Sequence, residues 1–371
     1  MLLIKSNKET LLKPLQTVTG IVENRNTSPI LSNVLIQQDS EEISFLTTDL
    51  EIQIKTVLKN TSTTEPSFSL TVSAKKFQDI LRSLTENTEI ILIQQEHHLQ
   101  VKAGKSIFSL QILPAEDFPK VSEETEPEVS ITLKQKDFKK LLQQTQFSIA
   151  HQDIRYYLNG LLLLIEDSYL KSAATDGHRL AYSAINLEES NVKKEIILPR
   201  KAVLEVAKLL NDSDEPVKIE FIQNKIRFSF SNVILTSKVI DGKFPDYNRV
   251  IPTQNTKQFD LDRLTFLQAL QRVSILSNLN EKFRGVHLII SSGNLRIICK
   301  NNEQEEAQEE IEIQYEHETI DISLNITYLI DLLNNISSKK ILCFLNDANS
   351  SILITIPENK EFKYILMPMR I

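Results

Sequence analysis

The segment Thr175–Ala181 (TDGHRLA) brings together side chains that could take part in catalysis. An aspartate that orients a histidine can make the imidazole a general base, so Asp176 and His178 would suit a hydrolase. The sequence has no G-x-S-x-G nucleophile motif, no glycine-rich phosphate loop and no paired-carboxylate metal motif to complete such a site. We therefore expect a protein that is not an enzyme, and the simplest role for this segment is a polar turn that closes a hairpin.

Two further segments do not have the composition of ordinary loops or chain ends. Phe244–Pro252 (FPDYNRVIP) is bracketed by prolines, and a packed connector between domains is its simplest interpretation. The chain ends in Tyr364–Ile371 (YILMPMRI), whereas termini are usually polar and frayed. This end could be a final core strand, or part of a binding groove in which the adaptable methionine side chains are useful.

The composition is that of a globular protein without a membrane span. Apolar residues make up 41% of the chain and charged residues 25%, which is ordinary for a folded domain. No apolar run approaches the roughly 18 residues of a membrane-spanning helix and no signal peptide is apparent, so we expect a cytoplasmic protein. Cys299 and Cys343 lie in apolar runs and are expected to be buried free thiols. The six histidines lack metal-ligand spacing, so neither a metal nor another cofactor is expected.

An apolar stripe of helical spacing occurs three times along the chain, at steps of 126 residues. Its copies are Phe77, Ile80, Leu81 and Leu84; Val203, Val206, Ala207 and Leu210; and Leu329, Leu332, Leu333 and Ile336. The i, i+3, i+4, i+7 spacing places the four side chains of each copy on one helical face. A repeat near one third of the chain length predicts three copies of one domain.

Each third of the sequence predicts the same order of elements: a helix, a strand, the stripe helix and then short strands. The first helices are expected at Leu11–Val18, Phe138–Gln146 and Leu264–Val273. Lys218–Ser231 predicts a hairpin with its turn at Gln223-Asn224. Acidic or proline-containing linkers, Glu123–Glu128 and Pro252–Thr256, place the domains at residues 1–124, 128–252 and 253–371.

Positive charge recurs along the predicted helices although the formal net charge is −7. The helices carry Lys13, Lys75, Lys76, Arg82, Lys139, Lys140, Arg200, Lys201, Lys208, Arg263 and Arg272. Any exposed helix face can carry lysine for solubility alone. The recurrence in equivalent helices of three domains favours a positive surface that could hold a phosphate backbone without reading its bases.

Several long motifs resemble those of the bacterial sliding clamps, the beta subunits of the replicative DNA polymerase III holoenzyme. They are TDGHRLA at Thr175–Ala181, HQDIRYYLNG at His151–Gly160, FPDYNRVIP at Phe244–Pro252, EKFRGV at Glu281–Val286 and the terminal MPMRI. Together with the triplicated layout, the resemblance covers the whole chain from Leu11 to its last residue.

The resemblance implies an α+β fold of three repeated DNA-clamp domains, each with two helices packed on antiparallel sheet. Two copies would join head to tail as a homodimer and form a closed ring around duplex DNA. The implied function is that of a processivity clamp, which slides along DNA and tethers the polymerase and other replication and repair proteins. The implied partners are duplex DNA bound without sequence specificity, the replicative polymerase subunit, the clamp loader and other clamp-motif proteins. A monomeric DNA-binding scaffold of the same domain type is the alternative.

The resemblance also implies two kinds of site. A hydrophobic pocket between the second and third domains would bind short peptide motifs through Leu158, Thr175, Gly177, His178, Arg179, Leu180, Pro245, Arg249, Val250, Ser351, Ile365, Met367, Pro368 and Met369. DNA would be contacted by Arg25, Gln152, Tyr156, Tyr157, Arg200 and Lys201. The two tyrosines could stack on unpaired bases, or simply pack into a loop.

The implied dimer interface would bring Phe108 and Leu110 of one copy against Ile275 and Leu276 of the other, and pair two edge strands. Nearby Lys75, Lys102 and Lys105 could face Glu303, Glu305 and Glu306. Two positions depart from the family pattern: Asn278–Asn280 lengthens a segment beside the interface, and Asn248 replaces a residue that is often basic.

Overall fold

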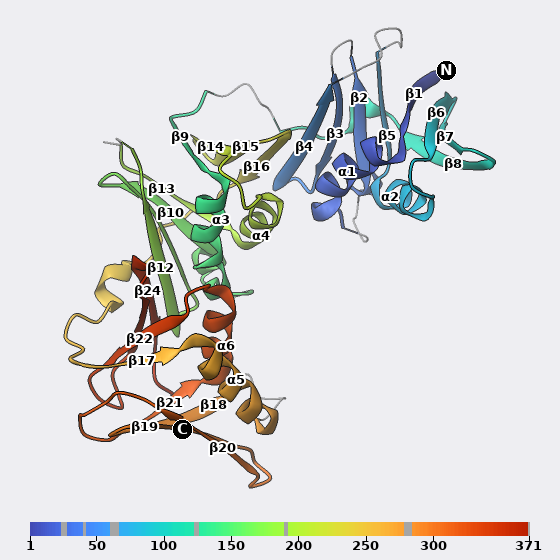
Figure 1. Ribbon diagram of the computed structural model, residues 1–371. Coiled ribbons are helices and arrows are strands. Elements are labelled where there is room, and N and C mark those ends of the chain that lie inside the picture. Colours follow the sequence, from blue (N-terminus) through green and yellow to red (C-terminus); the bar gives the residue numbers. More distant parts are fainter. Residues whose placement is uncertain are drawn as a thin grey trace. The chain divides into compact units, whose positions relative to one another are not determined.

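The computed structural model describes residues 1–23, 28–39, 42–59, 67–121, 126–188, 192–277 and 284–369. Its contacts divide the chain into two compact units, Met1–Phe138 with Leu204–Val239, and Lys139–Val203 with Ile240–Ile371. Two helices, α3 (Gln135–Gln143) and α4 (Arg200–Leu209), each begin in one unit and end in the other. Figure 1 labels most of the helices and strands of both units.

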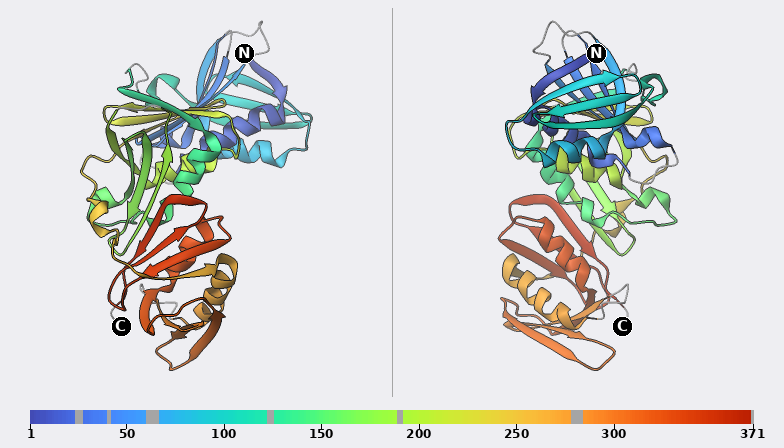
Figure 2. Two further views of the ribbon diagram at one scale, coloured as in Figure 1. Left: turned by 60° about the vertical axis from the view of Figure 1, so that its left-hand side comes forward. Right: turned by 90° about the vertical axis from the view of Figure 1, so that its right-hand side faces the viewer.

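The first unit is built on an antiparallel sheet with twelve strands among the described residues. In sheet order they are β1 (Leu2–Asn7), β6 (Glu89–Gln95), β7 (His98–Ala103), β8 (Ser106–Leu113), β5 (Phe68–Ser73), β2 (Asn33–Gln38), β3 (Glu42–Thr48), β4 (Ile52–Lys59), β16 (Val233–Lys238), β15 (Lys225–Phe230), β14 (Pro216–Ile222) and β9 (Val129–Lys134). Helices α1 (Lys8–Val18) and α2 (Ala74–Ser83) lie side by side and pack on strands β2 to β5 (Figure 2). The apolar faces of helices and sheet thereby bury each other.

The second unit holds two antiparallel sheets. The larger contains β13 (Lys194–Pro199), β10 (Gly160–Glu166), β11 (Tyr169–Thr175), β12 (Arg179–Asn186), β24 (Asn359–Leu366), β23 (Ile352–Ile356), β22 (Lys340–Leu345) and β17 (Lys257–Asp262). The smaller contains β20 (Glu306–Glu312), β19 (Asn294–Lys300), β18 (Gly285–Ser291) and β21 (Ile320–Asn325). Helices α5 (Arg263–Val273) and α6 (Ile326–Asn335) lie side by side and share one apolar core with both sheets.

The three stripe helices confirm the repeat that the sequence predicts. They begin at Ala74, Arg200 and Ile326, which keeps the 126-residue step. The stripes of α4 and α6 are fully buried, whereas Ile80 and Leu84 of the first copy are half-buried. Each helix ends one residue before the last stripe residue, so that residue belongs to the chain leaving the helix.

Equivalent contacts also tie the first helix of each repeat to the C-terminal end of its stripe helix or to the chain just beyond it. Lys8 at the start of α1 donates from Nζ to the carbonyl of Leu84 over 2.5 Å. Gln135 at the start of α3 accepts through Oε1 from the amide of Asn211 at 3.1 Å. The Arg263 Nη1 at the start of α5 donates to the carbonyl of Leu333 at 2.7 Å. Three different side chains thus satisfy polar groups at equivalent helix ends.

Other local predictions also hold, with small shifts at the boundaries. The predicted hairpin is formed by β14 and β15, with Gln223 and Asn224 in its turn. Cys299 and Cys343 are buried free thiols, and burial raises the pKa of both. The predicted helix at Phe138–Gln146 instead starts at Gln135 and ends at Gln143, and Gln146 begins a short 3₁₀ turn, η4 (Gln146–Ser148).

Candidate functional site

The segment 175–181 forms the tight turn of the β11–β12 hairpin. Thr175 and Leu180 are paired across the two strands. The Thr175 hydroxyl donates to the carbonyl of Arg179 at 2.6 Å, and the Asp176 Oδ1 accepts from the amides of His178 and Arg179 at 3.0 and 3.1 Å. Gly177 has φ +91, a conformation that other residues rarely adopt. The prediction of a polar turn is confirmed, and the Asp176 carboxylate serves mainly to hold its backbone.

The C-terminal segment lies directly beside this turn. Strand β24 pairs with β12, so that Leu366 is opposite Arg179 and Ile365 is opposite Leu180. The amide of Met367 then donates to the carbonyl of His178 at 3.0 Å. Strand β24 is thus a core strand, while the exposed side chain of Met367 extends beyond it. The core-strand interpretation of the apolar chain end is therefore confirmed, and the binding-groove interpretation stays a prediction.

The segment Phe244–Pro252 contributes the third side of the site. Phe244 and Tyr247 are buried, and the ring of Tyr247 stacks on Tyr182 with 5.4 Å between centroids. A short 3₁₀ turn, η6 (Tyr247–Val250), leaves the Val250 side chain exposed. The expected packed connector is therefore correct for the aromatic residues, whereas Val250 remains available at the surface.

These three segments and the short 3₁₀ turn η5 (Tyr156–Leu158) enclose a cavity of about 450 Å³. Twelve of the fourteen residues that the sequence motifs suggested line it: Leu158, Thr175, Gly177, His178, Arg179, Leu180, Pro245, Arg249, Val250, Ser351, Ile365 and Met367. Pro368 and Met369 are not among the lining residues, and the amide of Met369 donates instead to the carbonyl of Ser323 at 2.8 Å. The lining also includes residues that the sequence did not point to as pocket residues, namely Arg155, Tyr157, Phe244, Asp246 and Tyr247.

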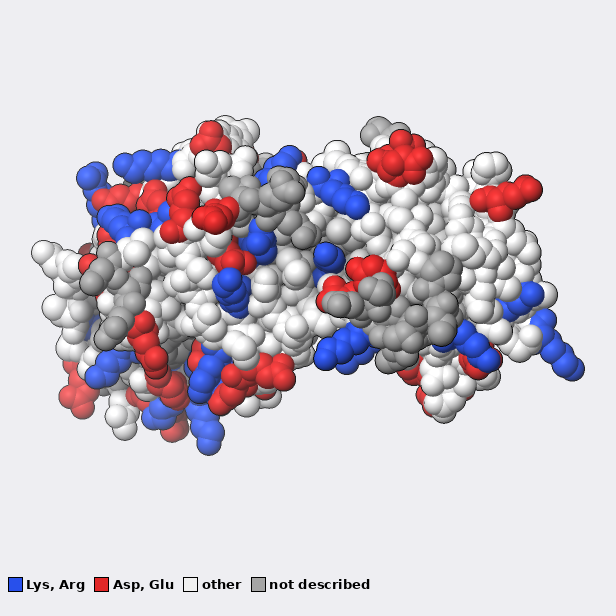
Figure 3. All heavy atoms as spheres, turned by 90° about the horizontal axis from the view of Figure 1, so that it is seen from above, with Lys and Arg blue, Asp and Glu red and all other residues white. Residues whose placement is uncertain are grey.

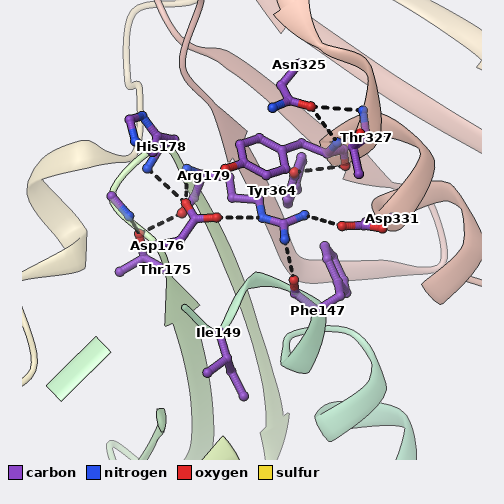
Figure 4. A network of polar contacts seen from close by, with 12 residues as sticks. Phe147, Ile149, Thr175, Asp176, His178, Arg179, Asn325, Thr327, Asp331 and Tyr364 are labelled. Carbon is purple, nitrogen blue, oxygen red and sulfur yellow. Dashed lines mark hydrogen bonds and ion pairs between the residues drawn. The ribbon is translucent and has the colours of Figure 1, made fainter. Parts of the chain in front are cut away.

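Arg179 is the most tightly held charged residue of the cavity (Figure 4). Its side chain is 8% exposed, and its Nε donates to Asp176 at 3.1 Å. Its Nη1 donates to Asp331 at 2.8 Å and its Nη2 to the carbonyl of Phe147 at 2.6 Å. Burial alone would lower the pKa of Arg179, but Tyr364, Asp331 and Asp176 outweigh it and the pKa is raised. The guanidinium is therefore a fixed cation.

Two tyrosines beside Arg179 belong to the same packed region. The Arg179 guanidinium lies over the Tyr328 ring, 4.1 Å from its centroid. Burial, with the nearby Asp176 carboxylate, raises the pKa of Tyr328 to about 12. Burial raises the pKa of Tyr364 as well, and its hydroxyl donates to the carbonyl of Tyr328 at 3.1 Å. Both phenols are therefore neutral at physiological pH.

The residues suggested for DNA contact have mixed surroundings. Gln152 and Tyr156 are exposed and share a surface loop with Ile154, which is almost fully exposed. Tyr157 lines the cavity, which the sequence did not indicate. Arg200 is half-buried, and its Nη1 donates to the carbonyl of Ile149 at 3.0 Å; burial and Arg179 lower its pKa. Lys201 is half-buried, and Arg25 lies outside the described residues.

Two arginines of helix α5 have partners within the chain. Arg263 binds the carbonyls of Leu333 and Ser338, and Arg272 forms an ion pair with Glu309, with 2.6 Å between Nε and Oε1. Arg272 is still 55% exposed, and the positive surface that the helix cations favour stays a prediction. The face drawn in Figure 3 carries basic and acidic side chains side by side.

The suggested interface residues lie at strand edges or next to them. Strand β8 pairs with β7 along Ser106–Gln111 but with β5 only at Ile112 and Leu113, so one side of Ser106–Gln111 has no strand partner among the described residues. Phe108 is half-buried and Leu110 is buried within its own chain, whereas Ile107, which the sequence did not single out, is 60% exposed.

On the other side of the suggested interface, Ile275 is 74% exposed and Leu276 is half-buried. Strand β20 forms an edge of its sheet. The insertion at Asn278–Asn280 lies outside the described residues.

No helix among the described residues is long and apolar enough to span a bilayer. No group of three or more His, Cys, Asp or Glu side chains among them is placed to hold a metal ion.

Comparison with known proteins relates the whole chain to one family. Three family models of the DNA polymerase III beta subunit match in succession: the N-terminal domain at residues 2–122, the central domain at 132–246 and the C-terminal domain at 248–370. The chain is 42% identical to the beta sliding clamp of Pseudomonas aeruginosa and 41% identical to that of Escherichia coli, covering 98% of each chain in both comparisons.

Solved structures give the same result. The fold matches the DNA polymerase III subunit beta of Pseudomonas aeruginosa with a TM-score of 0.94 at 40% identity, covering both chains fully. The same organism's sliding clamp bound to griselimycin matches with a TM-score of 0.94 at 41% identity, again over both full chains. The beta subunit of Caulobacter crescentus matches with a TM-score of 0.90 at 35% identity over 100% of both chains.

Proposed function

Because the chain belongs to the family of DNA polymerase III beta subunits, the bacterial sliding clamps, we propose that the cavity around Leu158, Leu180 and Met367 holds short peptide segments of its partner proteins. The chain has the family's three repeated domains of helices and antiparallel sheet, and its function is that of a processivity clamp in DNA replication.

The observation that carries the peptide proposal is the convergence of three distant segments on one largely apolar cavity. Its volume of about 450 Å³ falls in the range of sites that bury a few side chains of a ligand. Leu158, Leu180 and Ile365 form apolar walls, and Met367 can adapt to different side chains. Such a site suits small apolar anchors of several partners in turn, among them the replicative polymerase subunit, the clamp loader and other clamp-motif proteins.

Griselimycin offers a direct probe of this cavity, since the Pseudomonas aeruginosa clamp has been crystallised with it. We expect it to bind this protein, and Val250→Glu to weaken the affinity at least about tenfold by placing a charge at an apolar wall. Val192→Glu is the matched control, because Val192 is also exposed but is not among the lining residues. Equal affinities of the two variants in a calorimetric titration would contradict the proposal.

For the dimer, we propose that strand β8 of one copy pairs with strand β20 of a second copy, head to tail. Both strands have an open edge among the described residues, and exposed Ile107 and Ile275 lie on or near them. Lys102 and Lys105 beside β8 could face Glu305 and Glu306 at the start of β20 and favour this orientation. Two such contacts would close a ring.

Mass measurement at micromolar concentration should give twice the chain mass. Ile107→Asp should shift the measured mass toward that of the monomer. A monomeric wild type would contradict the closed ring.

For DNA, we propose that the ring encloses the duplex and that its contacts do not read the sequence. Exposed Gln152 and Tyr156 and the half-buried Lys201 are the described candidates for contact. After loading by a clamp loader, the protein should stay on nicked circular DNA and leave when the circle is cut. Rapid loss from intact circles would contradict the enclosing ring.

We further propose that the protein catalyses no reaction of its own and acts in the cytoplasm. The Asp176 carboxylate holds backbone amides and the Arg179 guanidinium, which is a structural use of the group. His178→Ala should therefore change only ligand affinity. Loss of a hydrolytic turnover in that variant would contradict the proposal.

A further inference from the structure

A second cavity adjoins the proposed peptide cavity and shares a wall with it. It has a volume of about 430 Å³ and a polar lining of Phe147, Ile149, Ala150, His151, Asp153, Arg155, Asp176, His178, Arg179, Arg200, Tyr328 and Asp331. Arg155, His178 and Arg179 line both cavities. Of these three, Arg179 is the buried one, so its position fixes the inner part of the shared wall.

The position of Arg179 depends on three separate segments of the chain. Asp176 belongs to the hairpin turn itself and Phe147 to η4. Asp331 belongs to helix α6 and is 152 residues away from Arg179 in the sequence. Figure 4 shows the guanidinium extended between the two carboxylates, with the Phe147 carbonyl below it. Asp331 itself is 37% exposed, lines only the second cavity and is outside the proposed peptide cavity.

We propose that Asp331 is a positioning residue for peptide binding, which acts through Arg179 and without touching the peptide. This inference rests on the proposed function of the cavity. By holding Nη1, Asp331 fixes the guanidinium over Tyr328 and keeps the inner wall of the peptide cavity formed before a ligand arrives.

The physical reason is preorganisation. An arginine side chain has several rotatable bonds, and fixing it only when a ligand binds costs affinity. Asp176 holds Nε and the Phe147 carbonyl holds Nη2, and neither of these contacts engages Nη1. The Asp331 carboxylate of α6 adds the third contact, at Nη1, and so restricts the side chain further before a ligand binds. The stripe helix α6 is an element of the repeat, and here it supports the peptide cavity, which is not part of the repeat.

The first test is the affinity for griselimycin of Asp331→Ala, with Asp321→Ala as the matched control. Asp321 is an exposed aspartate of the same unit, whose nearest basic group is His287 at 3.5 Å, and it lines neither cavity. We expect Asp331→Ala to weaken binding about three- to tenfold, and Asp331→Asn to recover part of the loss because its amide oxygen can still accept from Nη1. Asp321→Ala should leave the affinity unchanged. Equal affinities of Asp331→Ala and Asp321→Ala would overturn the positioning role.

The second test separates positioning from a general loss of structure. If Asp331 acts through Arg179, adding Asp331→Ala to Arg179→Ala should change the affinity less than twofold. A loss as large as in the wild-type background would overturn the proposal. Nitrogen-15 arginine labelling gives a readout that needs no ligand: the Arg179 Nε–H signal, identified by its absence in Arg179→Ala, should move in Asp331→Ala and stay in place in Asp321→Ala.

The proposed function can fail separately from this inference. If Val250→Glu binds griselimycin as the wild type does, the ligand is not in the cavity and both proposals fail. If Val250→Glu weakens binding while Asp331→Ala does not, the peptide cavity stands and only the role of Asp331 is refuted.

Discussion

Helix α6 is held in place by apolar burial, whereas the turn between β11 and β12 is held by polar contacts to distant parts of the chain. Leu329, Leu332 and Leu333 of α6 are at most 1% exposed. The turn relies on single atoms, such as the Asp176 oxygens and the guanidinium of Arg179. The stabilisation of a buried apolar helix is spread over many contacts, whereas the geometry of a polar turn depends on a few hydrogen bonds. Substitutions in the stripe should therefore cost stability, and substitutions in the turn should chiefly cost binding.

The largest effect is expected in the stripe. Leu332→Ala removes a fully buried side chain and should destabilise the second unit by about 2–5 kcal/mol. Leu264→Ala, at an exposed position of the adjacent helix α5, should change stability little. Thermal unfolding measures both. Griselimycin affinity at a temperature where Leu332→Ala is folded should stay within about twofold of wild type. Similar stability for the two variants would contradict the buried-stripe account.

In the turn, Gly177→Ala should affect both stability and binding. A side chain at φ +91 is strained by about 1–3 kcal/mol. An added Cβ would also lie 3.0 Å from the Arg155 Nη2, which lines the cavity. Gly293→Ala is the matched control, because Gly293 has φ +77 with no neighbouring atom within 4 Å of an added Cβ. Both variants should lower the melting temperature, but only Gly177→Ala should weaken griselimycin binding. A loss of affinity in both would show that backbone strain alone explains it.

The terminal methionines test whether the cavity or the sequence motif defines the site. Met367 lines the cavity and is exposed, so Met367→Ala should weaken binding by about 1–2 kcal/mol with little loss of stability. Met369 is not a lining residue, so Met369→Ala should bind griselimycin almost as the wild type does. Calorimetric titration of both variants decides between the two views. Equal losses would favour the wider site that the motif suggested.

The smallest effect is expected at the start of helix α5, where a single side chain caps the helix. Asp262 caps this helix: its Oδ1 accepts from the amide and the hydroxyl of Thr265, each at 2.8 Å, and these bonds lower its pKa. Asp262→Ala should cost about 0.5–1 kcal/mol near neutral pH. Because the folded-state pKa is depressed, the contribution is complete above the unfolded value near 3.9 and is lost as the pH falls through the folded value. The melting-temperature difference between wild type and variant should therefore shrink below about pH 4; a difference that grows on acidification would contradict the sign.

The repeated fold could be predicted from the sequence because its signal is local. Four apolar residues on one helical face can be recognised without knowing what they contact, and the 126-residue step gives the register of the three copies. The boundaries were less accurate, because α3 begins three residues before the first apolar residue of its pattern. The partners of Arg263 and Arg272 within the chain were missed, since they come from other elements.

The candidate site was predicted in part, and only through motifs of a known family. Twelve residues of the suggested set meet at one cavity, but periodicity alone could not have brought Leu158, Thr175, Pro245 and Met367 together. Arg155 lies within a family motif but was not singled out, and Asp331 gave no signal in the sequence. Their contacts with the turn and with Arg179 exist only after the chain has folded.

The most direct test of the account is primer extension on singly primed circular DNA, with the polymerase and clamp loader of the same organism. The wild type should support long products. Val250→Glu should remain a dimer and load onto DNA but yield products no longer than those made without the clamp, because its peptide cavity is blocked, while Val192→Glu should behave as the wild type. Full-length products with Val250→Glu would contradict the claim that this protein holds its polymerase through the cavity at Leu158, Leu180 and Met367.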